Sequence, residues 1–152
     1  STIEAGDLQY MSAGSGVYHS EYNPSDANLT HLYQIWLQPN ETGGEPRYAE
    51  KKLGETAPDN ELTLLFSGSG REGSTAIRQD AEIHFGKLDA GSSLEIASDA
   101  DRPHLWLQVI SGGVNVAGES LETGDGLAIE NEPEALSVEA TVNTRFLLFR
   151  LS

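Results

Sequence analysis

The sequence predicts an all-β protein, and three observations support this prediction. The 152 residues include 16 glycines and 6 prolines, which divide the chain into short segments. Many segments alternate apolar and polar residues, which is the period of a strand with one buried face. Segments with the 3.6-residue period of an amphipathic helix are scarce. We therefore expect short strands joined by turns along the whole chain.

The first third of the chain contains one long predicted strand and a polar connector. In "LTHLYQIWLQP" (29–39), apolar and aromatic residues occur at both alternating sets of positions. This pattern predicts a strand that is largely buried on both sides and ends at Pro39. The segment "EPRYAEKKLGETAPDNE" (45–61) is polar and interrupted by proline and glycine. It is interpreted as the connector between two units.

Seven further strand candidates lie between residues 61 and 152. They are "ELTLLFSG", "AEIHFGKLDAG", "SLEIASD", "HLWLQVISGGVNVAG", "GLAIENE", "LSVEA" and "TRFLLFRLS", separated by Gly, Asp and Asn turns. Such spacing is typical of a sandwich or barrel. The stretch "ISGGVNV" predicts a tight hairpin with two glycines able to adopt positive φ. The stretch "SGSGREGS" predicts a flexible surface loop.

A short internal repeat indicates that the chain contains two related units. "IEAGDLQYM" (3–11) and "LETGDGLAI" (121–129) share an apolar-Glu-x-Gly-Asp core at an offset of 121 − 3 = 118 residues. Carried forward, this offset pairs Glu21 with Glu139 but His19 with Ser137. The chain is thus interpreted as the end of one β unit and the whole of a second, in which the histidine is lost.

The composition excludes several classes of partner. Nine Lys and Arg against 24 Asp and Glu give a net charge of 9 − 24 = −15, which argues against nucleic acid and anionic membrane surfaces. No apolar run approaches the length of a membrane helix, and we expect a cytoplasmic protein. With no cysteine, a disulfide framework, a thiolate metal site and a Cys nucleophile are excluded. Any metal site must therefore use histidine, carboxylate and water.

His19 and Glu21 are the candidate metal ligands. If residues 17–22 are extended, as Val17, Tyr18 and Tyr22 favour, both side chains project from one face of the segment. An imidazole with a carboxylate suits Fe(II), Mn, Ni, Cu or Zn. A stable site needs three or four protein ligands, and this pair supplies two. The alternative is that both are surface polar residues beside a turn.

The other histidines have simpler interpretations. His31 is a candidate third ligand, or a hydrogen-bonded structural residue. His84 alternates with Ile83 and Phe85 and is expected to face solvent. His104 begins a strand in which, with Trp106 and Gln108, it is a candidate to line the interior of the second unit, and a buried, hydrogen-bonded histidine is the favoured alternative. The glycine-rich stretches match neither a dinucleotide-binding fingerprint, a P-loop nor the nucleophile elbow of hydrolases.

The segments "AGDLQYMSAGSGVYHSEYNPS", "HLYQIWLQP" and "EPRY" closely resemble the pirin family of two-cupin proteins, especially its bacterial quercetin 2,3-dioxygenase-like branch. The residues that fall on the family pattern are Gly6, Asp7, Met11, Ala13, Gly14, Gly16, His19, Ser20 and Glu21. The resemblance implies a cupin fold, a double-stranded β-helix or jelly-roll barrel. It divides the chain into the C-terminal part of the N-terminal cupin (1–48), a connector (49–60) and a degenerate, metal-free C-terminal cupin (61–152).

The resemblance also implies a metal centre. In this family the N-terminal cupin binds one metal, usually iron, through three histidines and a glutamate, and the carry-over gives His19 and Glu21. The other two ligands belong to a His-x-His segment that these 152 residues do not contain. Either a missing N-terminal segment or a second copy of the chain then completes the first barrel. Fe(II) is the expected metal, with Ni, Cu, Mn and Zn as alternatives, or the metal is absent from this shorter chain.

The function that the resemblance implies is a metal-dependent dioxygenase acting on a flavonol such as quercetin with O₂. Glu21 would serve as ligand and as the base that removes the 3-hydroxyl proton, whereas His19 would be a ligand only. Two alternatives remain at this point: a non-enzymatic metal-binding regulatory protein that acts through protein contacts, and an inactive fragment with an incomplete metal site.

Overall fold

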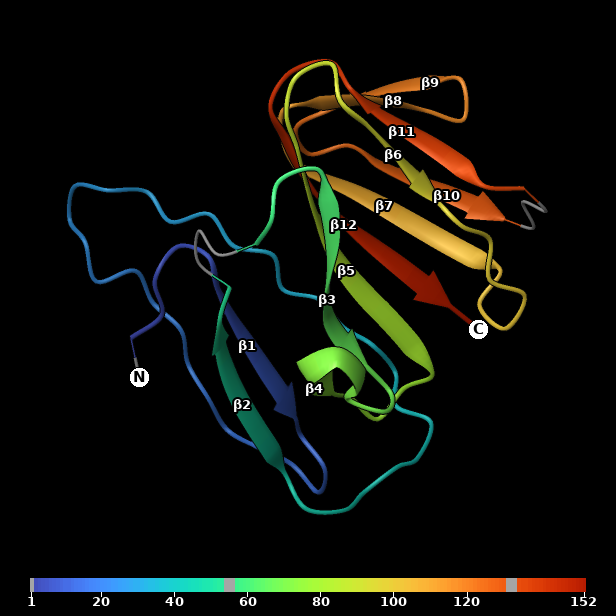
Figure 1. Cartoon of the computed structure of the whole chain (residues 1–152). Coiled ribbons are helices and arrows are strands. Elements are labelled where there is room, and N and C mark those ends of the chain that lie inside the picture. Colours follow the sequence, from blue (N-terminus) through green and yellow to red (C-terminus); the bar gives the residue numbers. More distant parts are fainter. Residues whose placement is uncertain (1, 54–56, 131–133) are drawn as a thin grey trace.

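The computed structural model describes residues 2–53, 57–130 and 134–152, and strands dominate these ranges (Figure 1). The first unit, residues 2–53, contains β1 (Asp7–Ser12) and β2 (Arg47–Lys52). The second unit is formed by residues 61–130 and 134–152. Its elements are β3 (Glu61–Ser67), the 3-10 turn η2 (Arg71–Gly73), β4 (Thr75–Ala76), β5 (Ala81–Leu88), β6 (Ser93–Ile96), β7 (His104–Ser111), β8 (Gly113–Val116), β9 (Glu119–Glu122), β10 (Gly126–Glu130), β11 (Leu136–Ala140) and β12 (Thr144–Leu151).

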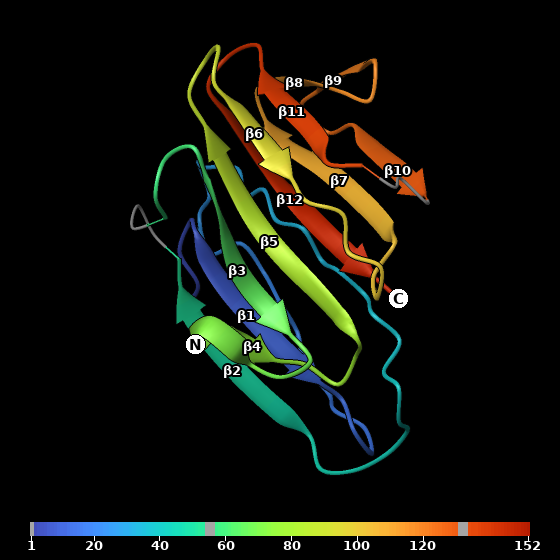
Figure 2. The same ribbon diagram turned by 45° about the vertical axis from the view of Figure 1, so that its right-hand side comes forward.

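The second unit consists of two sheets that face each other. The larger sheet has the order β10-β7-β12-β5-β3-β4 and the smaller one β6-β11-β8-β9, as both ribbon views show (Figures 1 and 2). All pairs are antiparallel except β3 with β4. The space between the sheets is filled by apolar side chains, including Leu107, Val114, Val138, Phe146 and Leu148. The all-β prediction and the cupin barrel are confirmed.

Each of the seven strand candidates contains a strand, although the predicted hairpin at "ISGGVNV" is wrong. β7 and β8 lie in different sheets, so the chain crosses between the sheets at Gly112, whose φ is 93°. The hairpin occurs one strand later, where β8 pairs with β9. Ala117 and Gly118 form its two-residue loop with φ of 51° and 81°, as a type I′ turn requires. The last two residues of "GLAIENE" lie outside the described ranges.

The first unit packs against the second through a separate apolar cluster on the outer face of the six-stranded sheet. Leu65, Ile83 and Phe149 of that sheet contact Leu53, with Leu8 and Leu37 packed beside them. β1 and β2 pair antiparallel with each other, in the register Gln9↔Glu50. β2 therefore places a strand across the predicted boundary at residue 48, and residues 54–56 of the predicted connector lie outside the described ranges.

The predicted strand at 29–39 is wrong. Residues 13–46 contain no strand, and Leu29 and Trp36 are 101% and 86% exposed. The segment contacts the second unit where the Tyr33 hydroxyl donates to the Val109 carbonyl (3.3 Å) and Leu37 enters the cluster between the units. Among the described residues, no strand pairs with it.

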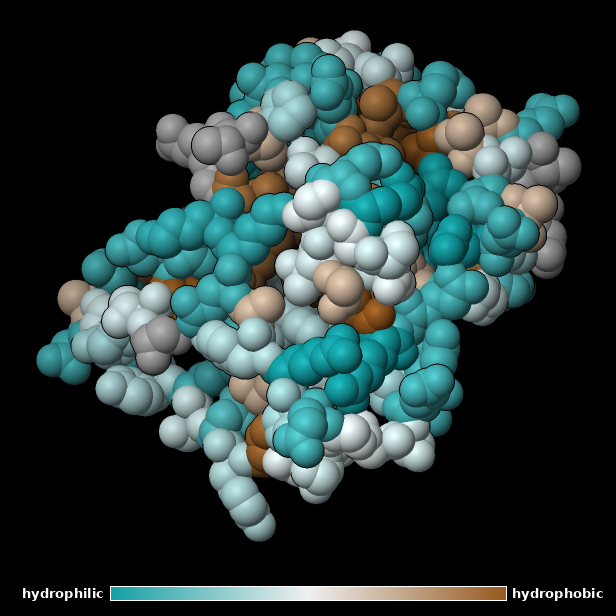
Figure 3. All heavy atoms as spheres, turned by 60° about the horizontal axis from the view of Figure 1, so that its bottom comes forward, coloured by the Kyte–Doolittle hydropathy of each residue, from teal (hydrophilic) through white to brown (hydrophobic). Residues whose placement is uncertain are grey.

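The surface agrees with the acidic composition. Seen from the end that carries β2 and β4, the molecule is mainly hydrophilic, and hydrophobic residues appear in small separate areas (Figure 3). Within the described residues, no helix has the length and apolarity needed to cross a bilayer.

Candidate metal centre

The side chains of His19 and Glu21 meet in the structure. His19 Nδ1 lies 3.6 Å from Glu21 Oε1, and the two side chains are 42% and 40% exposed. Both residues lie in a segment without assigned secondary structure. An imidazole and a carboxylate two residues apart therefore meet here without strand pairing.

The turn before the pair is held against a second loop. Gly14 has φ of 53°, and a Cβ atom there would lie 2.3 Å from the Gly44 carbonyl oxygen. The backbone N–H of Ser15 donates to the same carbonyl at 3.0 Å. Only glycine fits such a close approach at positive φ. The contact fixes where the chain enters the segment that carries His19.

The pair fits a divalent transition metal as two of its ligands. Nitrogen and oxygen ligands bind such ions at about 2.1 Å, so two donors of one ion lie at most about 4.2 Å apart. The 3.6 Å between His19 Nδ1 and Glu21 Oε1 is within this limit. In the described part of the chain, no three His, Asp or Glu side chains gather as a metal site would need. His31 instead contacts the Tyr33 ring, with centroids 5.0 Å apart.

The internal repeat is visible in three dimensions at its Gly-Asp turn. The Asp7 carboxylate accepts a hydrogen bond from the Glu4 backbone N–H (3.0 Å), and Asp125 accepts the same bond from Glu122 (2.9 Å). The glycines before these aspartates have φ of 88° and 93°. Equal geometry at both turns supports the interpretation that the two units are related.

Beyond β1 and β10, the offset of 118 residues pairs His19 and Glu21 with outward-facing residues of the second unit. Leu136, Val138 and Ala140 of β11 face the core, whereas Ser137 and Glu139 are exposed on the opposite face. If the offset continued, His19 and Glu21 would also face outward, away from a barrel interior. Side chains alternate between the two faces of a strand. If His19 and Glu21 point into a barrel, the number of residues between the Gly-Asp turn and the following segment must therefore differ by an odd number between the two units.

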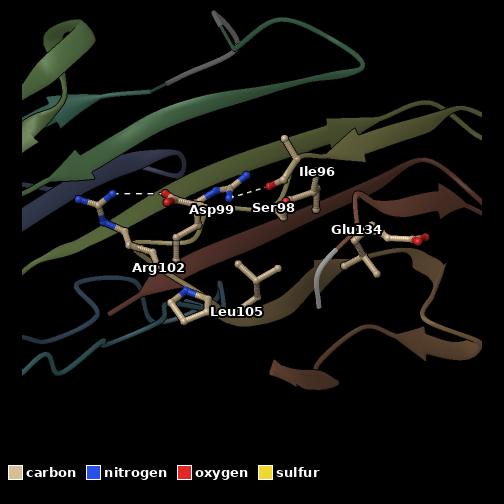
Figure 4. A pocket seen from close by; sticks show the side chains of 10 residues that line it. Ile96, Ser98, Asp99, Arg102, Leu105 and Glu134 are labelled. Atoms are coloured by element: carbon tan, nitrogen blue, oxygen red, sulfur yellow. Dashed lines mark hydrogen bonds and ion pairs between the residues drawn. The ribbon is translucent and has the colours of Figure 1, made fainter. Parts of the chain in front are cut away.

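Side chains fill the described interior of the second unit around Gly86. The Phe146 ring occupies the space above this glycine, where a Cβ atom would lie 2.2 Å from the ring. At the end of the barrel near Arg102 and Leu105, a cavity of about 10 Å³ has room for one water (Figure 4). Arg102 is fixed there by Asp99, with 3.3 Å between Nη1 and the carboxylate.

The prediction that His84 faces solvent is wrong. His84 is 9% exposed, and its Nε2 lies 3.2 Å from the Glu82 carboxylate. Arg71 of η2 donates two hydrogen bonds to Glu82, both of 2.8 Å, and these hold the pKa of Glu82 below its ordinary value. Burial lowers the pKa of His84. Because the Arg71 guanidinium already neutralises this carboxylate, we interpret Arg71, Glu82 and His84 as a structural hydrogen-bonded network in which Arg71 and Glu82 form the ion pair.

This network was missed because Arg71 lies in the stretch interpreted as a surface loop. The stretch is tied to the sheet, since the hydroxyls of Ser67 and Ser74 lie 2.8 Å apart in a hydrogen bond. The only local signal was the Glu-x-His spacing within β5.

The prediction that His104, Trp106 and Gln108 line the interior is also wrong. The alternate residues Leu107 and Val109 face the core, and Trp106 is 39% exposed. The Nδ1 atom of His104 is buried without a hydrogen-bond partner among the described residues.

Two facing antiparallel sheets closed around an apolar core define the second unit as a cupin barrel. Comparison with known families gives the closer assignment: the quercetinase C-terminal cupin domain matches residues 64–151, and the pirin family matches residues 1–37. The chain belongs to the pirin family, and the resemblance noted in its sequence is confirmed.

Individual relatives support this assignment. Quercetin 2,3-dioxygenase of Escherichia coli K12 is 40% identical over 151 residues, 98% of this chain and 62% of that protein. A pirin-like protein of Caulobacter vibrioides is 36% identical over 129 residues, 84% of this chain and 55% of that protein. The crystal structure of the bacterial pirin YhhW from E. coli in complex with nickel(II) superimposes with a TM-score of 0.89 at 38% identity, covering 98% of this chain and 62% of that one. The chain thus spans less than two thirds of the length of these relatives.

Proposed function

We propose that the chain is part of a metal-dependent cupin dioxygenase that acts on a flavonol such as quercetin, with His19 and Glu21 as two of the metal's protein ligands. The observation that carries the proposal is the convergence of these side chains to 3.6 Å. It is supported by the 40% identity to a protein named quercetin 2,3-dioxygenase across 98% of the chain.

Fe(II) is the proposed metal, with Ni, Cu, Mn and Zn as alternatives. Imidazole and carboxylate ligands suit all of these ions, and the related pirin YhhW is known in complex with nickel(II). Such an ion supplies a Lewis acid beside which the flavonol and O₂ meet.

The two residues then have different tasks. His19 holds the ion and keeps Glu21 in position. Glu21 carries a carboxylate beside the substrate, where it accepts the proton of the flavonol 3-hydroxyl. The remaining ligands are proposed to come from sequence preceding residue 1, or alternatively from a second copy of the chain, because the described residues bring only two ligands together.

Metal analysis with oxygen uptake on the natural full-length chain tests the proposal. We expect one equivalent of metal per chain and O₂ consumption with quercetin, and loss of both in His19→Ala. His31→Ala is the matched control and should retain both, because His31 is a histidine outside the pair. Stoichiometric metal without turnover on a panel of flavonols would favour the regulatory alternative. Unchanged metal content in His19→Ala would contradict the ligand assignment.

A further inference from the structure

The two faces of β1 have different surroundings. Leu8 packs in the cluster between the units, and the Tyr10 ring lies 6.3 Å from that of Phe66, so both point toward the second unit. Because side chains alternate along a strand, Gln9 and Met11 point to the other side.

The internal repeat shows which face of β10 corresponds to the face of β1 that carries Gln9 and Met11. The matched turns align Gln9 with Leu127 and Met11 with Ile129, each at the offset of 118 residues. Leu127 and Ile129 pack into the core between the two sheets of the second unit. By this correspondence, Gln9 and Met11 face the interior of the first barrel. A polar residue thus stands where the second unit has leucine.

Gln9 is the start of a hydrogen-bonded chain on that face. Its Nε2 donates to the Tyr48 hydroxyl at 2.7 Å, and this hydroxyl in turn donates to a carboxylate oxygen of Glu50. The strand register places Gln9 opposite Glu50 and Met11 opposite Tyr48. All these side chains therefore lie on one face of the β1–β2 sheet, the face turned away from the second unit.

β2 is what brings Tyr48 and Glu50 to this place. In the second unit β10, the counterpart of β1, is the edge strand of its sheet. In the first unit β2 pairs along β1 (Figure 1). This pairing covers one edge of β1 and carries a phenol and a carboxylate onto the interior-facing side.

We propose that Gln9, Tyr48 and Glu50 line the substrate pocket of the first cupin and bind hydroxyl groups of a polyphenolic ligand. This inference rests on the proposed function, which it deepens. A carboxylate and a phenol oxygen held side by side accept hydrogen bonds from ligand hydroxyls, and the fixed orientation of Tyr48 between Gln9 and Glu50 selects for ligands that donate there.

The test is quercetin binding under anaerobic conditions by the metal-loaded, natural full-length chain. Tyr48→Phe removes one hydroxyl, and Gln9→Leu installs the residue of the second unit. We expect each substitution to weaken quercetin binding about tenfold, because each removes a hydrogen bond from a network that includes the Glu50 carboxylate. Metal content and thermal stability should be unchanged. Tyr10→Phe is the control on the opposite face of β1 and should bind like the wild type.

The outcomes distinguish failure of this inference from failure of the proposed function. Wild-type affinity in Tyr48→Phe, or equal weakening in Tyr10→Phe, would overturn this inference and leave the proposed function intact. A wild-type protein that binds neither metal nor quercetin would overturn the proposed function and the inference with it. If Tyr48→Phe fails to fold, Gln9→Leu decides by the same comparison.

Discussion

Segment 29–37 of the first unit and strand β12 of the second both have apolar and aromatic residues at both alternating sets of positions, but only β12 forms a strand. β12 lies between β5 and β7, paired with both, and Leu148 is 0% exposed. In the first unit Trp36 is 86% exposed, and no strand forms between residues 13 and 46. At the offset of 118 residues, the starts of β5 and β7 fall at 81 − 118 = −37 and 104 − 118 = −14, outside the 152 residues.

This difference shows that strand propensity depends on available partners. A β-branched or aromatic pattern describes a side chain that fits a paired, half-buried surface, and does not by itself fix an extended backbone. β12 has two neighbours, and its side chains are buried accordingly. Segment 29–37 only rests against the outer face of the six-stranded sheet.

The largest expected difference between the two regions is in the loss of stability when an aromatic side chain is removed. Phe146→Ala should lower the free energy of unfolding by about 4 kcal/mol, because it leaves a cavity around a fully buried ring. Trp36→Ala removes a larger side chain but should change stability by less than about 0.5 kcal/mol, since the ring is exposed. Urea unfolding of the 152-residue chain measures both. Similar losses in the two variants would show that segment 29–37 is packed in solution.

The second prediction compares the stability cost of breaking one ion pair in each unit. Glu82 is 7% exposed and bound by Arg71, whose own side chain is 44% exposed, so Glu82→Gln should cost about 2 kcal/mol. In the first unit Lys52 and Glu4 are 77% and 73% exposed, and Lys52→Gln should cost about 0.5 kcal/mol or less. Equal losses in urea unfolding would contradict the difference in burial.

The same pair predicts a pH dependence. Hydrogen bonds from Arg71 lower the pKa of Glu82 from its ordinary 4.5, so its contribution to stability is present above that value and is lost as pH falls through the lower, folded-state pKa. The stability difference between wild type and Glu82→Gln should therefore be largest above pH 4.5 and shrink in more acid solution. If the stability difference instead grew below that pH, the Arg71–Glu82 ion pair would be excluded as its cause.

The smallest effect concerns Ser137, which the offset of 118 residues pairs with His19. Ser137→His recreates a His-x-Glu sequence with Glu139, but on the exposed face of β11. We expect a stability change within about 0.5 kcal/mol and no stoichiometric metal in the 152-residue chain. Metal analysis together with thermal unfolding checks this. Tight binding of one metal ion would show that an outward pair on one strand is sufficient.

Much of the second unit could be predicted from local sequence, because its strands alternate regularly and turn residues separate them. The errors occur where distant residues decide. The alternation of β5 predicts an exposed His84. In the structure His84 is buried and contacts Glu82, which is paired with Arg71. The glycines of "ISGGVNV" fit a hairpin, but the chain uses Gly112 to change sheets. For the candidate metal centre, residue spacing placed His19 beside Glu21, whereas no local pattern could place Tyr48 beside Gln9.

The sequence by itself determined the all-β class, the seven strand segments of the second barrel, the repeated Gly-Asp turn and the pairing of an imidazole with a carboxylate at positions 19 and 21. These features depend on side-chain period and on backbone conformations that neighbouring residues set. Tertiary structure alone decided that segment 29–37 forms no strand, which faces of β7 and β11 are buried, and which residue β2 brings to Gln9. Those outcomes depend on hydrogen bonds and packing between residues far apart in the chain, and a local pattern does not contain them.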